Sequence, residues 1–274
     1  MTGPQANDLF DEVLVLSLPG ADERRAYVTD HLRAHGISDF SFFDASAADS
    51  PETDAAYADG LVATYPPCFR CGKTSCGRPD CNNVLIAPQV ATFVSYLRLW
   101  RHIAARRGCF LVLEDDVKLH ANWQPALNFL AEMRGSKAPW LDASQPRLLR
   151  LGWALCAEHD ESREFAIRQD VRMSNPCHAI TSAFATALLD RFRTICVTVD
   201  TFMHRDAPLD GEAWTLFPPV ASELSWSTGA LASQIHPKLV RSDYLAQRGL
   251  LEEAAEAERQ ARHHARHIAH REPT

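Results

Sequence analysis

The feature that most constrains the fold is a run of five apolar residues, Cys109 to Leu113, that leads directly into the acidic residues Glu114 to Asp116. A short run that is apolar at every position is typical of a buried strand. In α/β proteins, ligands bind at the carboxyl ends of the strands of the parallel sheet. The sequence therefore predicts that these three carboxylates stand at a ligand-binding edge of an α/β sheet.

The beginning of the chain has the pattern of a strand, a helix and a second strand. Val13 to Leu18 is a short apolar run that ends at Pro19-Gly20. A helix is expected from Asp22 to Gly36, and another strand from Phe40 to Asp44. This order predicts a mostly parallel sheet flanked by helices. Further expected elements are a short helix within Ala45–Tyr65, a long helix over Gln89–Arg107, a strand at Leu148–Leu151, a strand end with a helix within Ala179–Arg193, and a long helix over Tyr244–His270.

Composition and charge exclude some classes of protein. Hydrophobic residues make up 46% and charged residues 23%, which is ordinary for a globular protein. The net charge of −7 disfavours broad binding to duplex nucleic acid. No run approaches the roughly 20 apolar residues of a membrane span, and the first residues lack the pattern of a signal peptide. We therefore expect a cytoplasmic protein with at most a peripheral contact at the inner membrane face.

The three carboxylates predict a metal site. They would repel one another, and Mg²⁺ or Mn²⁺, which prefer hard oxygen ligands, would remove that cost. Such a metal can bridge the two phosphates of a nucleotide sugar and stabilise the departing diphosphate. Alternate residues of a strand point to the same side, so Glu114 and Asp116 are the expected metal ligands, with Asp115 close by as a catalytic residue. The alternative is a solvated acidic turn.

A cluster of four cysteines predicts a second, structural metal site within residues 66–83. Four thiols in so short a span can hold zinc tetrahedrally, and cytoplasmic thiols stay reduced. The alternatives are two disulfides or free thiols. The spacing is similar to that of a zinc knuckle, a module that can bind single-stranded nucleic acid, but we expect it to fix a long loop near the active site. The expected zinc ligands are Cys68, Cys71, Cys76 and Cys81.

Several segments resemble glycosyltransferase family 25, which includes bacterial lipooligosaccharide galactosyltransferases and collagen galactosyltransferases. Leu111 to Val117 is similar to the acidic metal-binding motif of the family. Val13 to Arg25 resembles its opening strand and paired arginine, with Ser17 in place of an asparagine. Val199 to Met203 resembles its Val-Asp-x-Phe-Leu segment. The resemblance is discontinuous and extends over about residues 12–235.

The resemblance implies a GT-A-like fold and an inverting transfer of a hexose, such as galactose, from a uridine diphosphate sugar to a glycan, lipid-linked glycan or glycoprotein acceptor. An inverting transfer needs a base for the acceptor hydroxyl and stabilisation of the leaving diphosphate. Asp200 is the candidate base, and its alternative role is that of a helix N-cap. Ser17, Arg24, Arg25 and Glu114 are candidate donor-binding residues, although one arginine could simply belong to a solvated helical turn.

Two departures from the family pattern leave other interpretations open. Tyr96 stands where the family has a histidine, and the family's Gly-Glu-x-Gly stretch is absent near Ile86 to Gln89. The chain could therefore be a catalytically degenerate relative that binds glycan or single-stranded nucleic acid through its cysteine module. A nucleotidyl enzyme that uses the same acidic turn is a further alternative.

The predicted domain organisation follows from these patterns. Residues 1–243 are expected to form the GT-A-like domain, with the zinc-binding insertion inside it. Residues 244–274 are expected to form a helical tail, where glutamates precede arginines in the order that complements a helix dipole.

Overall fold

The computed structural model describes residues 3–63, 85–135, 142–154, 164–225, 230–231 and 233–235. The predicted zinc-binding insertion at 66–83 and the predicted tail at 244–274 lie outside these residues, so both stay predictions. The helices are α1 (Ala6–Leu9), α2 (Asp22–Ala34), α3 (Pro51–Ala58), α4 (Ala87–Ala104), α5 (Trp123–Gly135), α6 (Ser182–Arg191), α7 (Val199–Thr201) and a π-helix, η2 (Phe202–Asp206). The strands are β1 (Glu12–Ser17), β2 (Ser41–Asp44), β3 (Cys109–Glu114), β4 (Val117–Leu119), β5 (Leu148–Arg150), β6 (Ala166–Arg168), β7 (Cys177–Thr181), β8 (Ala213–Phe217) and β9 (Ala221–Glu223).

The central sheet has the strand order β2-β1-β3-β7-β5-β8-β6. Strands β2, β1, β3, β5 and β8 run in one direction, whereas β7 and β6 run in the other. The predicted α/β fold with a mostly parallel sheet is thus confirmed, and it is consistent with a GT-A-like fold. A separate ribbon pairs β4 with β9 in antiparallel fashion, so that Val117 lies opposite Glu223.

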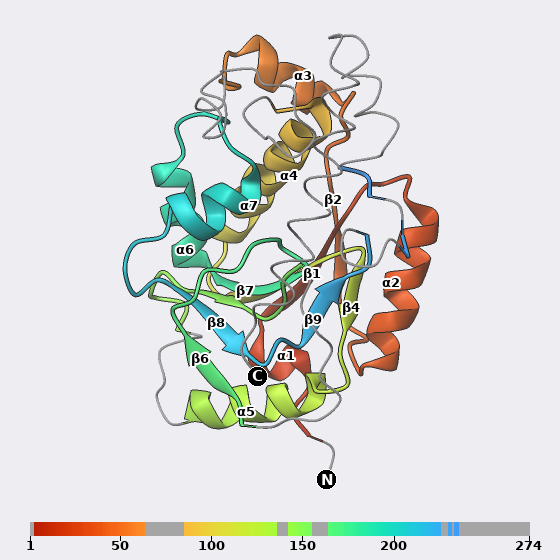
Figure 1. Cartoon of the computed structure of the whole chain (residues 1–274), viewed down its shortest axis with the longest axis vertical. Helices are drawn as coiled ribbons and strands as arrows, with labels where there is room; N and C mark the ends of the chain where they lie inside the picture. Colours follow the sequence, from red (N-terminus) through yellow and green to blue (C-terminus); the bar gives the residue numbers. More distant parts are fainter. Residues whose placement is uncertain are drawn as a thin grey trace, which may run out of the picture.

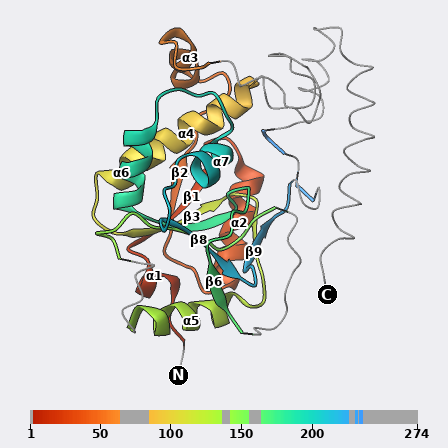
Figure 2. The same cartoon turned by 60° about the vertical axis from the view of Figure 1, so that its left-hand side comes forward.

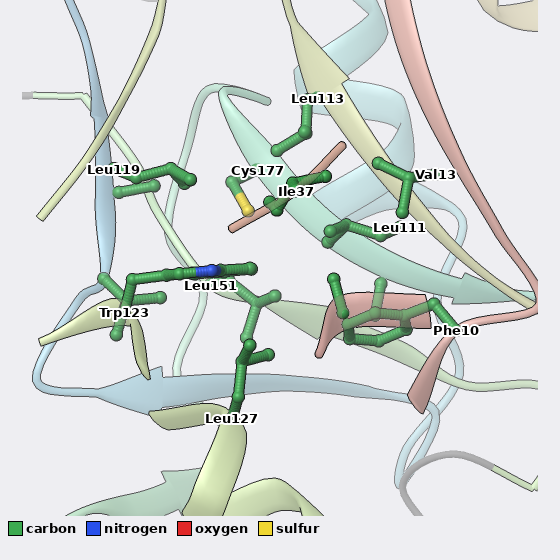
Figure 3. Packing of buried hydrophobic residues seen from close by; sticks show 14 of the residues in the cluster. Phe10, Val13, Ile37, Leu111, Leu113, Leu119, Trp123, Leu127, Leu151 and Cys177 are labelled. Carbon is green, nitrogen blue, oxygen red and sulfur yellow. The ribbon is translucent and has the colours of Figure 1, made fainter. Parts of the chain in front are cut away.

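Both faces of the sheet are covered, which explains why β3 is apolar at every position. Leu111 and Leu113 point to one face and pack with α1, α2 and α5, whereas Phe110 and Val112 point to the other and pack with α4 and α6. Figure 2 shows these layers in turn, with α4 and α6 on one side of the strands and α1 and α5 on the other. Figure 3 shows the packing on the first face, where Trp123, the first residue of α5, and Leu127 from the same helix approach the sheet.

The helices begin and end where local chemistry predicts. Helix α2 carries Asp22 in its first turn, and the chain leaves it through Gly36, whose φ of +79° favours glycine. Helix α4 has a proline in its first turn and buries one wide face under the sheet. Figure 1 shows α2 and α4 on different sides of β1. Helix α7 begins at Val199, so Asp200 lies inside this helix and is not its N-cap, which is Thr198.

Within the described residues, no helix combines the length and the apolar character that crossing a membrane requires.

His31 ties α2 to β4 and gives the fold a pH dependence. Its Nε2 accepts a hydrogen bond from the backbone N–H of Leu119 at 2.8 Å, and only an unprotonated nitrogen can accept this bond. Burial, followed by the nearby His35, Lys118 and His120, lowers the pKa of His31 from 6.5 to about 4. Because the pKa of His31 is lower in the folded state than in the unfolded state, the stabilisation of the fold by neutral His31 is complete above pH 6.5. It is lost as the pH falls towards 4.

We therefore expect His31→Gln to flatten the dependence of unfolding free energy on pH between 6.5 and 4. The side chain is only half-buried, so the expected difference in slope corresponds to about 1–2 kcal/mol over this interval. Urea unfolding at several pH values measures it. Identical slopes for the variant and the wild type would contradict this role of His31.

Candidate active site

A pocket of about 570 Å³ opens at the carboxyl ends of β1, β2 and β3. Its walls come from the ends of β1 and β3, the segment 45–48 after β2, the first turns of α4, the segment 173–175, and α7 with Asp200. Glu223 at the end of β9 completes the wall beside the acidic residues. A volume of this size lies in the range of small-molecule sites, and its position matches the ligand-binding edge predicted for the sheet.

Asp115 is held by two donors from the neighbouring strand and helix. Ser17 at the end of β1 donates from Oγ to Asp115 Oδ2 at 2.7 Å. Arg24 in α2 places Nη2 2.6 Å from Asp115 Oδ1. Burial raises the pKa of Asp115, while Arg24 and Ser17 act in the opposite direction. The fold thus brings together three predicted site residues, Ser17, Arg24 and Asp115. Asp115 is held in place by its contacts with Ser17 and Arg24.

Asp116 shares the same arginine but keeps one oxygen unsatisfied. Arg24 Nη2 lies 3.2 Å from Asp116 Oδ2, which also accepts a hydrogen bond from Ser225. The other oxygen, Oδ1, is buried and has no hydrogen-bond partner among the described residues. A buried carboxylate oxygen without a donor is costly, so it marks a position where a ligand or cation would be stabilising.

Glu114 faces the opposite layer of helices. The hydroxyl of Tyr96 in α4 donates to Glu114 Oε1 at 2.8 Å. Burial, and then the negative charges of Asp116 and Glu223, raise the pKa of Glu114 well above its ordinary value. Burial and Glu114 likewise raise the pKa of Tyr96, so the phenol keeps its proton and remains a donor. The residue that departs from the family pattern is therefore hydrogen-bonded to the acidic motif.

Glu223 is a site residue that the sequence analysis missed. Its carboxylate accepts a hydrogen bond from Ser174 Oγ at 2.6 Å. Burial raises its pKa to about 7, with smaller contributions from Asp116 and Asp200. Glu223 lies on a strand of only three residues, and it reaches the pocket through pairing with β4, so no local pattern in the sequence identifies it.

Asp200 and Arg25 occupy different surroundings. Asp200 lies in α7, lines the pocket, and has no hydrogen-bonded partner among the described residues. Arg25 is not part of the described pocket wall. Its guanidinium pairs with Asp44 Oδ1 at 2.5 Å and donates to the backbone oxygen of Ser17 at 3.2 Å, which holds the ends of β1 and β2 together.

A buried polar chain supports the opposite wall of the pocket. Arg150 in β5 donates from Nε to His204 Nδ1 at 2.8 Å, and the Nε2–H of His204 donates to Asn175 Oδ1. Both nitrogens of His204 are therefore engaged, which fixes the ring as the Nε2–H tautomer. Asn175, whose oxygen is held in this way, lines the pocket. The sequence predicts no role for Arg150 or Asn175, which come from separate segments.

The acidic residues fit a divalent cation only together with a bound phosphate. Among the described residues, no three His, Cys, Asp or Glu side chains are arranged to hold a metal by themselves. Mg²⁺ and similar cations are, however, often held by one or two carboxylates together with substrate phosphates. The unsatisfied Oδ1 of Asp116 and the raised pKa of Glu114 fit this shared type of site. The zinc ligands predicted at 66–83 lie outside the described residues.

Comparison with known proteins agrees with this geometry. Residues 10–203, more than half of the chain, match the family described as Glycosyltransferase family 25 (LPS biosynthesis protein). The matched segment contains Ser17, Arg24, the acidic residues and Asp200, and it ends before Glu223. No curated protein matches the sequence.

Tyr96→Phe tests the link between α4 and the acidic motif. The variant removes a donor to a buried carboxylate, so we expect it to lower the free energy of unfolding by about 1.5–3 kcal/mol. Tyr27→Phe is a matched control, because the hydroxyl of Tyr27 donates to the backbone oxygen of Val117 at 3.0 Å and its loss should cost only about 1 kcal/mol. Urea unfolding at pH 7.5 compares them. Equal effects of the two variants would contradict a special role for Tyr96.

Proposed function

The chain belongs to glycosyltransferase family 25 and is therefore a glycosyltransferase, and we propose that it transfers a hexose, such as galactose, from a uridine diphosphate sugar to an acceptor hydroxyl with inversion at the sugar carbon. The observation that carries the proposal is the placement of Glu114 to Asp116. These residues follow a buried strand and line a pocket at the carboxyl edge of the sheet, where nucleotides bind in α/β proteins.

The donor diphosphate is assigned to the side of the pocket formed by β1, α2 and β3. Glu114 and Asp116 are the residues that would hold Mn²⁺ or Mg²⁺, which would supply positive charge to the departing diphosphate. The guanidinium of Arg24 places a positive charge beside Asp115 and Asp116, where it can pair with a phosphate oxygen. Ser17 and Asp115 position this arginine, since both contact the network that holds it.

The base is assigned to the opposite side of the pocket. Asp200 lines the pocket, and among the described residues its carboxylate has no hydrogen-bonded donor, so it is available to accept the proton of the acceptor hydroxyl. Glu223 also faces the pocket, but Ser174 already donates to it. We therefore assign the base to Asp200, and we assign Glu223 a role in positioning the acceptor.

The acceptor proposed is a glycan or glycoconjugate of the lipopolysaccharide type, in keeping with the description of the matched family. Such acceptors are attached to lipid, so a cytoplasmic enzyme with peripheral contact at the inner membrane face would meet them. We propose only a structural role for zinc, with Cys68, Cys71, Cys76 and Cys81 as its ligands.

We expect uridine diphosphate sugars to stabilise the wild type only in the presence of Mn²⁺ or Mg²⁺. At a hundred times its dissociation constant, a ligand that binds only the folded state adds about 2.7 kcal/mol, which a thermal-shift assay detects. Asp116→Asn should lose this stabilisation, because the variant keeps the shape of the side chain but removes its charge.

Asp30→Asn is the control for this experiment, because Asp30 is an exposed acid on α2 that does not line the pocket. It should respond to nucleotide sugars as the wild type does. If no nucleotide sugar shifts the wild type with either metal, the proposed donor class is wrong.

The assignment of the base predicts different kinetics for two isosteric variants. Asp200→Asn should lower kcat by about 10²–10⁴-fold with little change in KM for the donor, which is the loss expected for a general base. Glu223→Gln should mainly raise KM for the acceptor. A larger loss of kcat in Glu223→Gln than in Asp200→Asn would transfer the role of base to Glu223.

A further inference from the structure

Two arginines gather around one aromatic ring at the edge of the sheet. The guanidinium carbon of Arg168 lies 5.4 Å from the ring centre of Phe217, and that of Arg172 lies 5.3 Å from the same ring centre. Arg172 also lies 5.3 Å from the ring of Trp153, which packs against Phe217 with ring centres 5.2 Å apart. We call these four residues the arginine patch.

The register of the sheet explains the patch. Strand β6 is the last strand of the sheet, and Ala166 pairs with Phe217 while Arg168 pairs with Thr215. Arg168 and Phe217 are therefore diagonal neighbours on one face of an antiparallel pair of strands. Diagonal neighbours lie close enough for a long side chain to reach an aromatic ring. Arg168 lies on the last strand of the described part of the sheet and is exposed.

The described residues provide no acidic partner for the two arginines of the patch. Among the described residues, neither Arg168 nor Arg172 has a carboxylate within salt-bridge distance. Asp170 lies between them in the sequence, but no ion pair joins it to either. Both guanidinium groups lie over the Phe217 ring. Guanidinium N–H groups that lack a carboxylate partner can donate hydrogen bonds to a phosphate.

The patch is continuous with the rim of the pocket. Trp153 precedes Ala154, and Arg172 precedes Met173, and both following residues line the pocket. The backbone N–H of Ala154 donates to the oxygen of Met173 at 3.4 Å, which joins the two segments. The next residue, Ser174, is the hydrogen-bond donor to Glu223, so one short segment leads from the patch to the side of the pocket assigned to the acceptor.

We propose that the arginine patch binds a phosphate group carried by the acceptor saccharide and so selects phosphorylated acceptors. The inference rests on the proposed function, because it assigns the acceptor to the side of the pocket that holds Glu223. The patch lies by β8 and β6, whereas the donor diphosphate is assigned to β1 and β3, with β7 and β5 between them. In a chain with a net charge of −7, two neighbouring cations that have no acidic partner in the described part of the chain form a local site for an anion.

The test compares two forms of one probe on the full-length protein. The probe is the core oligosaccharide released from lipopolysaccharide, used with its phosphates intact and after dephosphorylation. Dissociation constants are measured by calorimetry for the wild type, for Arg168→Gln combined with Arg172→Gln, and for Arg33→Gln. Arg33 is an exposed arginine on α2 away from the pocket, so its variant controls for the loss of positive charge.

We expect the wild type to bind the phosphorylated form at least about tenfold more tightly than the dephosphorylated form. The double variant should lose this preference, because charge-assisted hydrogen bonds of this kind contribute about a factor of ten or more each. Arg33→Gln should keep it. The affinity for uridine diphosphate with Mn²⁺ should stay unchanged in all the proteins, and equal melting temperatures would show that the variants fold.

Three results would overturn the proposal. The first is equal binding of both forms, or binding of neither, by the wild type. The second is a preference that survives in the double variant. The third is a loss of affinity for uridine diphosphate in the double variant, which would place the patch in the donor site. Failure of the proposed function gives a different result, because the wild type would then not bind uridine diphosphate while its preference for the phosphorylated saccharide would still be measurable.

Discussion

The pocket depends on the balance of charge around the acids that end β3. Asp115 and Asp116 are tolerated side by side because Arg24 places one guanidinium nitrogen 2.6 Å from the first and 3.2 Å from the second. Further donors come from β1, where Ser17 donates to Asp115, and from α4, where Tyr96 donates to Glu114. Ser225 donates to Asp116. Helices α2 and α4 cover opposite faces of the sheet. The acidic motif is therefore assembled only when both layers of helices have packed.

The parts of this arrangement that sequence could predict are those with a local cause. The strand before Glu114 and the helix beginning at Asp22 follow from apolar runs, caps and periodicity, and they bring Ser17 and Arg24 to the acids. Glu223 and Asn175 could not be predicted, because each lies in or beside a short strand whose position depends on pairing with distant residues. The position of the antiparallel strand β7 between β3 and β5 could not be predicted either, because it too depends on pairing with distant residues.

The substitution at Tyr96 illustrates how structure changes the interpretation of a departure from a family pattern. The loss of a histidine left open the possibility of a degenerate site. In the fold, the tyrosine hydroxyl donates to a carboxylate of the acidic motif, and burial together with the neighbouring acids raises the pKa of Tyr96, so that it remains a donor. An imidazole N–H can donate a hydrogen bond as well, so the exchange conserves the type of group that faces Glu114.

The charges around the pocket are distributed unevenly, and this distribution constrains how two substrates could enter. Five acids line the cavity, and Arg24 is the only described cation in its wall. A diphosphate would approach these acids where Arg24, or a metal at Asp116 and Glu114, offsets their charge, which is why we propose that the donor binds on the side of β1 and β3. In this proposed arrangement the acceptor enters from the other side, past Met173 and Ser174. Arg168 and Arg172 lie beside that rim, where their positive charge would offset the repulsion between an anionic acceptor and the acids of the pocket.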